Sequence, residues 1–101
     1  MSDSIRADVA AFMALAPLPA SEEANQEHLE RLTEALMKIS FPVSRNEAIF
    51  LATAFGPDDC FGLAWTLVHL IESAPGGAPL DVIPESENEW IRLLRERQTR
   101  V

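Results

Sequence analysis

Proline and glycine divide this chain into five short segments, and that division limits what it can fold into. The breaks fall at residues 17–19, 41–42, 56–57 and 75–77. Between them, apolar residues recur three or four positions apart, as they do on one face of a helix. No alternating pattern typical of a strand continues beyond three or four residues. The sequence therefore predicts an all-α fold of about five helices.

The expected helices cover residues 4–16, 21–39, 45–55, 59–73 and 87–98. Ser21 and the pair Asp58-Asp59 are expected N-caps, and Ser44 and Ser86 each precede a glutamate by three positions, as in a capping box. The segments 45–55 and 59–73 are apolar on most sides, which indicates burial. We expect them to form a central helical hairpin covered by the other three helices, in a packing like that of helical repeats.

Length and composition predict one globular domain. A chain of 101 residues with 48% hydrophobic residues can fill one core but not two. Its single cysteine, Cys60, excludes an internal disulfide and favours a reducing compartment. The first residues lack the basic stretch of a secretion signal, and the longest apolar run, 60–71, falls short of the ~20 residues that cross a bilayer. These features predict a soluble, cytoplasmic protein.

Charge is spread unevenly along the chain. The formal net charge is −8, with fifteen of the sixteen acidic and four of the eight basic residues before residue 92. An acidic body repels phosphate backbones and anionic membranes, so we expect neither nucleic acid nor a membrane as partner. It suits a basic protein partner. The alternative is that the negative charge only maintains solubility.

An acidic stripe is the first candidate binding surface. Four glutamates of the segment 21–39 fall on one side, opposite its leucines. They are Glu23, Glu27, Glu30 and Glu34. Like charges four positions apart cost roughly 0.2–0.5 kcal/mol per pair, which favours a docking role. The alternative is a solvated face, because Arg31 and Lys38 partly offset the repulsion.

Asp58 and Asp59 form the second candidate. Two adjacent carboxylates at a turn could neutralise a lysine or arginine of a partner, or help to hold a metal. The alternative is simple N-capping of the helix that follows.

No catalytic, cofactor or metal site is expected. Cys60 and His69 lie on opposite sides of one expected helix, so we predict a buried cysteine and a histidine in helix packing. His69 and Glu72 supply only two metal ligands. His28 is predicted to lie at the core edge. An enzyme would need both histidines to converge with an acid such as Asp58 or Glu72, and one sequence does not exclude that arrangement.

The C-terminal arginines offer a further possibility. Arg97 lies on the inner side of the last expected helix, where it either extends along the core edge or pairs with an acid. Arg92, Arg95 and Arg100 lie outward. We expect this basic end to fold back on the acidic helix 21–39, with binding of an acidic partner as the alternative.

Residues 55–65 and 69–72 have the character of a family-defining stretch, combining turn residues, three acids and three Phe or Trp residues. In size, acidic charge and helical character, the chain resembles the small immunity proteins of bacterial toxin systems. That resemblance implies that an acidic face blocks the basic cleft of a cognate toxin. It assigns no individual residue.

The alternative is a helical adaptor or a homo-oligomer, such as a homodimer. Its interface would use apolar residues that have no obvious place in the helices. They are Phe41, Val43, Leu80, Val82 and Ile83.

Overall fold

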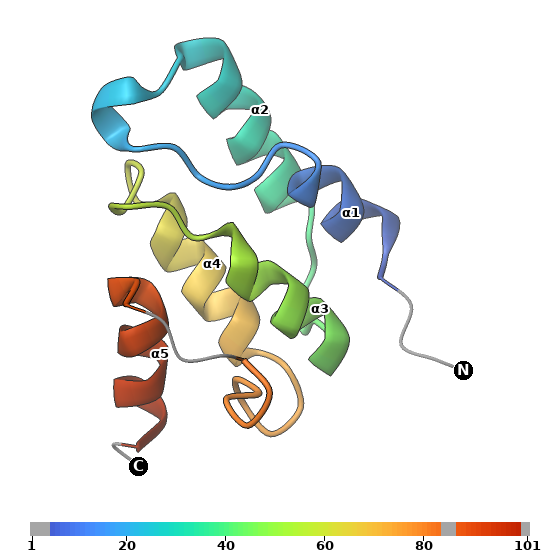
Figure 1. Ribbon diagram of the computed structural model, residues 1–101. Coiled ribbons are helices and arrows are strands. Elements are labelled where there is room, and N and C mark those ends of the chain that lie inside the picture. The colour runs from blue at the N-terminus through green and yellow to red at the C-terminus, as the bar shows by residue number, and fades with distance from the viewer. Residues whose placement is uncertain (1–4, 84–86, 100–101) are drawn as a thin grey trace.

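A computed structural model describes residues 5–83 and 87–99 of the chain, and the regular secondary structure of that part is all helical (Figure 1). It contains five α-helices and two short 3₁₀ helices, labelled η. Their bounds are α1 Ala7–Met13, η1 Ser21–Glu23, α2 Gln26–Met37, α3 Arg45–Leu51, η2 Ala52–Ala54, α4 Leu63–Glu72 and α5 Glu89–Thr99. The predicted all-α fold is confirmed.

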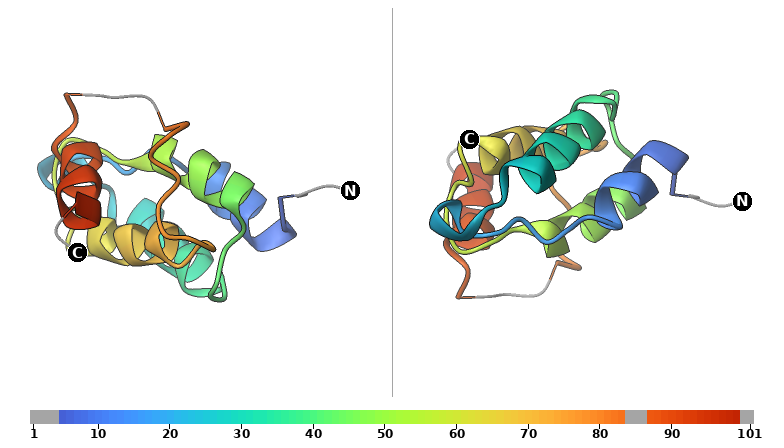
Figure 2. Two further views of the ribbon diagram at one scale, coloured as in Figure 1. Left: turned by 90° about the horizontal axis from the view of Figure 1, so that it is seen from below. Right: turned by 90° about the horizontal axis from the view of Figure 1, so that it is seen from above.

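The helices form two stacked pairs and a fifth helix at one side. In the views along the stack, α1 lies over α3, and α2 lies over α4 (Figure 2). α5 packs against α4 on the side away from α3 (Figure 1). The central pair α3–α4 is thus covered from two directions, which confirms the predicted hairpin.

Each α-helix contributes at least one completely buried large apolar side chain to the shared core. These side chains include Phe12, Leu32, Leu51, Leu67 and Leu94. Each contributes roughly 1.5–3 kcal/mol through removal of its surface from water. The helical spacing of apolar residues in the sequence therefore identified the core faces. It failed for α3, however, where Phe50 was expected to be buried and is 39% exposed.

The predicted helix 21–39 is broken in two. Ala24 and Asn25 have extended backbone, which separates η1 from α2. Asn25, not Ser21, is the N-cap of α2, because its side chain accepts a hydrogen bond from the His28 amide at 3.1 Å. Ser21 binds elsewhere in the fold, as shown below.

The predicted helix 59–73 begins later than expected, at Leu63. Its N-cap is Gly62, which offers no side-chain cap. The backbone carbonyls of Asp59 and Cys60 accept hydrogen bonds from the first amides at 3.1 Å instead. Asp58 and Asp59 therefore do not cap this helix by their side chains, contrary to prediction.

A buried glutamate joins α1 to α3. Glu47 is 1% exposed and completes the predicted capping box with Ser44. Its carboxylate also accepts hydrogen bonds from the Arg6 amide and from Arg6 Nε, both at 2.9 Å. Burial raises the pKa of Glu47, but the bonds from Arg6 and Ser44 outweigh it and lower the pKa to about 2. This carboxylate is used in holding the fold together.

Other expected features differ or lie outside the described residues. α1 is shorter than the predicted 4–16, of which residue 4 lies outside the described part. The capping-box residue Ser86 also lies outside it. The proposed apolar patch is divided, since Val43 and Ile83 are buried whereas Phe41 and Val82 are about half exposed.

Candidate functional site

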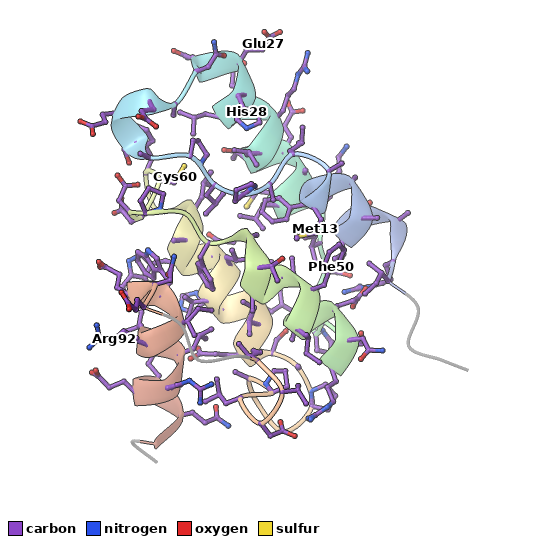
Figure 3. The ribbon with its side chains drawn as sticks, in the orientation of Figure 1. Met13, Glu27, His28, Phe50, Cys60 and Arg92 are labelled. Atoms are coloured by element: carbon purple, nitrogen blue, oxygen red, sulfur yellow. The ribbon has the colours of Figure 1, made fainter. Side chains whose placement is uncertain are left out.

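The acidic stripe is shorter than predicted. Glu27, Glu30 and Glu34 are exposed along α2, and Glu27 points into solvent at the top of the molecule (Figure 3). Glu23 belongs to η1 and does not continue the stripe, because the chain bends at residues 24–25. Arg31 pairs with Glu27 at 3.4 Å, so this surface is partly neutralised by its own helix.

Asp58 is the anchor of a second acidic region. Its carboxylate accepts hydrogen bonds from the Ser21 amide at 3.0 Å, the Ser21 hydroxyl at 3.1 Å and the Cys60 amide at 3.0 Å. The bonds from the Ser21 and Cys60 amides lower the pKa of Asp58. Asp58 therefore fastens the turn before α4 to η1, and its charge is used inside the protein.

The turn after Asp58 has an unusual backbone. Cys60, Phe61 and Gly62 have positive φ angles of 47°, 56° and 89° in succession. The left-handed region suits glycine but strains the other two residues by about 1–3 kcal/mol each. The rest of the fold compensates for this strain. In this conformation Cys60 lies in the core, whereas Phe61 remains exposed.

Exposed aromatic rings distinguish this turn. Phe61 is 67% exposed and Trp65, in the first turn of α4, is 40% exposed. The Trp65 ring meets the buried Trp90 ring edge-on at 5.3 Å, and Trp90 stacks on Phe55 at 6.1 Å. Trp65 therefore packs against Trp90, which is itself stacked on Phe55. Neither exposure was predicted from the sequence, although Gly62, three residues into the expected helix, was a signal that the chain turns there.

The first turn of α5 is bound to the same region. Trp90 Nε1 donates to the Asp58 carbonyl at 3.2 Å, and the side-chain Nδ2 of Asn88 donates to the Gly56 carbonyl at 3.0 Å. Among the described residues, five exposed carboxylates lie on η1, on the turn and around the start of α5. They belong to Glu22, Glu23, Asp59, Glu87 and Glu89. With Phe61 and Trp65 they form what we call the aromatic corner.

The carboxylates of the aromatic corner are not neutralised within the described residues. The four ion pairs found there are Arg6–Glu47, Arg31–Glu27, Arg45–Asp81 and Arg97–Glu72. None of them includes a corner carboxylate. An exposed apolar surface with unpaired negative charge around it is suited to binding a cationic group.

Cys60 and the two histidines differ in their burial. Cys60 is buried as predicted, and its burial, with the nearby charges of Asp58 and Asp59, raises the pKa of its thiol. His28, on α2, is partly buried as predicted. His69 is exposed beside Trp65, which corrects the predicted packing role.

The described arginines of α5 do not fold back on α2. Arg97 forms two hydrogen bonds with the carboxylate of Glu72 on α4, at 2.7 and 3.0 Å. Arg95 donates to the Ile83 carbonyl at 2.7 Å. The predicted fold-back is therefore wrong for these residues, because α5 packs on α4. Glu72, once considered as a metal ligand, is paired with an arginine.

An apolar hollow of about 520 Å³ lies between η2 and α5. It is lined by Ile49, Ala52, Thr53, Phe55, Val82, Ile83, Asn88 and Ile91. The Asn88 side chain bonds to Gly56 and to the Trp90 amide, and the Thr53 hydroxyl donates to the Phe50 carbonyl. The two polar side chains that line the hollow, Asn88 and Thr53, are therefore hydrogen-bonded within the protein.

The described residues hold neither a cluster of metal ligands nor a helix suited to the membrane. No three His, Cys, Asp or Glu side chains in 5–83 and 87–99 are grouped as metal ligands would be. In the same ranges, no helix has the length and apolar character to cross a membrane.

Neither a family model nor a curated protein nor a solved structure matches this chain.

Proposed function

We propose that this chain is a protein-binding domain that neutralises a basic protein by covering part of its surface. Its resemblance in size, charge and helical character to immunity proteins suggests the setting, with a bacterial toxin as the partner and the cytoplasm as the compartment. The observation that carries the proposal is the aromatic corner. There, Phe61 is 67% exposed on a strained turn, beside carboxylates that no described cation pairs.

Exposed aromatic side chains on a rigid support favour protein binding. Such residues provide most of the affinity at many interfaces, because they bury a large area with little loss of conformational freedom. Trp65 is already held by Trp90, and the turn carrying Phe61 is fastened by Asp58. The two rings therefore need little ordering when a partner binds.

The negative charge supports a basic partner. Charge across an interface raises the association rate and selects the partner more than it raises affinity. With a net charge of −8, the chain would attract a basic protein over a distance of about one Debye length, ~8–10 Å at moderate salt. The stripe on α2 would contribute to this attraction, and the aromatic corner would form the close contact.

The test is capture of the partner by the full chain from a lysate of its native host. Tagged wild-type chain and the Phe61→Ala/Trp65→Ala variant are loaded in parallel and washed at low and then high salt, and the retained proteins are identified by mass spectrometry. We expect one basic protein in stoichiometric amount, retained by wild type only and weakened by salt. The purified partner's own activity should then fall to zero at an equimolar amount of this chain.

Recovery of the untagged chain alone would contradict the proposal and favour a self-assembling protein. The control is the conservative variant Glu96→Gln on α5, outside both acidic surfaces, which should capture the partner as wild type does. Equal capture by the double aromatic variant would exclude the aromatic corner as the contact.

A further inference from the structure

The aromatic corner contains exposed rings and carboxylates without a described partner. Few ligands interact well with both kinds of group. We propose that the aromatic corner receives a single arginine side chain of the partner, with the guanidinium lying against the ring of Phe61 or Trp65 and pairing with the carboxylate of Asp59. This inference rests on the proposed function and assigns the chemistry of its central contact.

Asp59 is the available carboxylate of the turn. Asp58 already accepts hydrogen bonds from Ser21 and Cys60, whereas no described side chain donates to Asp59. Asp59 is also exposed and lies two residues before Phe61. Its free oxygens can therefore accept both N–H groups of a guanidinium in the paired geometry that arginine favours.

The rings select arginine over lysine. A guanidinium is planar and weakly hydrated, so it stacks on an aromatic face and loses little on leaving water. A lysine ammonium is compact and strongly hydrated, and it pairs with a carboxylate as a point charge. A surface with carboxylates alone would not distinguish the two cations, but a surface with two exposed rings beside them does.

Among the described residues, the chain's own arginines leave this position open to an outside cation. Arg6, Arg31, Arg45 and Arg97 each pair with an acid elsewhere, and Arg95 donates to a backbone carbonyl. Arg92 lies on the outer side of α5 (Figure 3). Charge complementarity thus indicates a cationic occupant, and the exposed rings indicate which cation.

The test uses two blocked peptides of equal length and charge, one alternating arginine with glycine and the other alternating lysine with glycine. Each is titrated into the ¹⁵N-labelled full chain, and amide and indole shifts are followed by NMR. We expect the arginine peptide to shift the signals of residues 58–65 and the Trp65 indole, and to bind at least threefold more tightly. Raising the salt concentration should weaken both peptides.

Three variants separate the contributions. Asp59→Asn should reduce binding of the arginine peptide several-fold. Phe61→Leu/Trp65→Leu, which keeps apolar bulk without rings, should bring arginine and lysine binding to the same level. The control Glu30→Gln, on α2, should change neither preference nor affinity by more than the general loss of one charge. Circular dichroism checks that each variant folds.

Equal affinity of the two peptides for wild type would overturn the arginine assignment, as would shifts centred on α2. Such a result leaves capture of a basic partner from the lysate unaffected, so failure of this inference is distinguishable from failure of the proposed function. Conversely, an arginine preference without any captured partner would support the corner chemistry and contradict the blocking role.

Discussion

The two acidic surfaces of this protein differ in how the fold holds them. The stripe on α2 is a row of glutamates on one helix, interrupted by Arg31, which pairs with Glu27. The aromatic corner is assembled from η1, the turn before α4 and the start of α5, and is fastened by hydrogen bonds to Asp58 and from Asn88. The stripe is thus a local feature and the corner a tertiary one.

This difference indicates what each surface can do. Exposed charges on a helix, partly neutralised and screened by salt, act mainly at long range and add little to a close contact. A strained turn that exposes Phe61 at 67% offers a rigid apolar group for burial. The charge pattern of the sequence favoured the stripe as the interface, whereas the exposed rings of the structure favour the aromatic corner.

The most severe test of the comparison removes both rings. Phe61→Ala/Trp65→Ala should weaken binding of the captured partner about a thousandfold, or ~4 kcal/mol, because each aromatic hot spot contributes about 2 kcal/mol or more. Isothermal titration calorimetry measures the loss. A loss below tenfold would place the main contact elsewhere and reverse the comparison.

The backbone that supports the aromatic corner can also be disturbed by a substitution at Gly56. A Cβ at Gly56 would lie 2.0 Å from the Leu18 carbonyl oxygen, so Gly56→Ala should lower the free energy of unfolding by about 3 kcal/mol. Gly76 has a φ of 83° with open space around it, and Gly76→Ala should cost about 1–2 kcal/mol from backbone strain alone. Urea unfolding distinguishes the two. Equal losses of unfolding free energy in the two variants would show that the backbone shifts to relieve the contact with Leu18.

An acid titration distinguishes the contribution of the buried Glu47 carboxylate to stability from that of the two exposed acidic surfaces. The pKa of Glu47 is about 2 in the folded protein and 4.5 ordinarily, so its contribution of ~3 kcal/mol is present above about pH 5 and is lost as the pH falls towards 2. Urea unfolding at several pH values measures this loss. Glu47→Gln should make stability much less dependent on pH over that range, with a smaller slope left by Asp58, whose pKa is also lowered in the fold. An unchanged acid slope in the variant would contradict the assignment.

The smallest effect is expected from reversing the stripe. Glu27→Lys/Glu30→Lys/Glu34→Lys should slow association about tenfold, or ~1.4 kcal/mol, and leave the dissociation rate nearly unchanged, because these charges act before contact. Stopped-flow measurements at low and high salt test this, and the difference should vanish at high salt. Complete loss of binding with the helical signal intact would restore the stripe as the interface.

The sequence by itself determined the features that depend on neighbours along the chain. Apolar spacing predicted the five helices, the central pair and core residues such as Leu67, and the Ser44–Glu47 capping box formed as expected. It also showed the acidic charge and the buried Cys60. These are local consequences of side-chain type and spacing, which any packing of the same helices must respect.

Only the tertiary structure decided which polar groups are used within the fold and which rings remain outside. Ser21 and Asp58 have good capping chemistry, yet they bond to each other across 37 residues, and this contact delays the start of α4. Arg6 reaches Glu47 across 41 residues, and Arg97 reaches Glu72 across 25. A hydrogen-bonding group satisfies itself with whichever partner the packing brings near, and the chain order does not specify that partner. For the same reason, the exposure of Phe61 and Trp65 was visible only once the turn was in place.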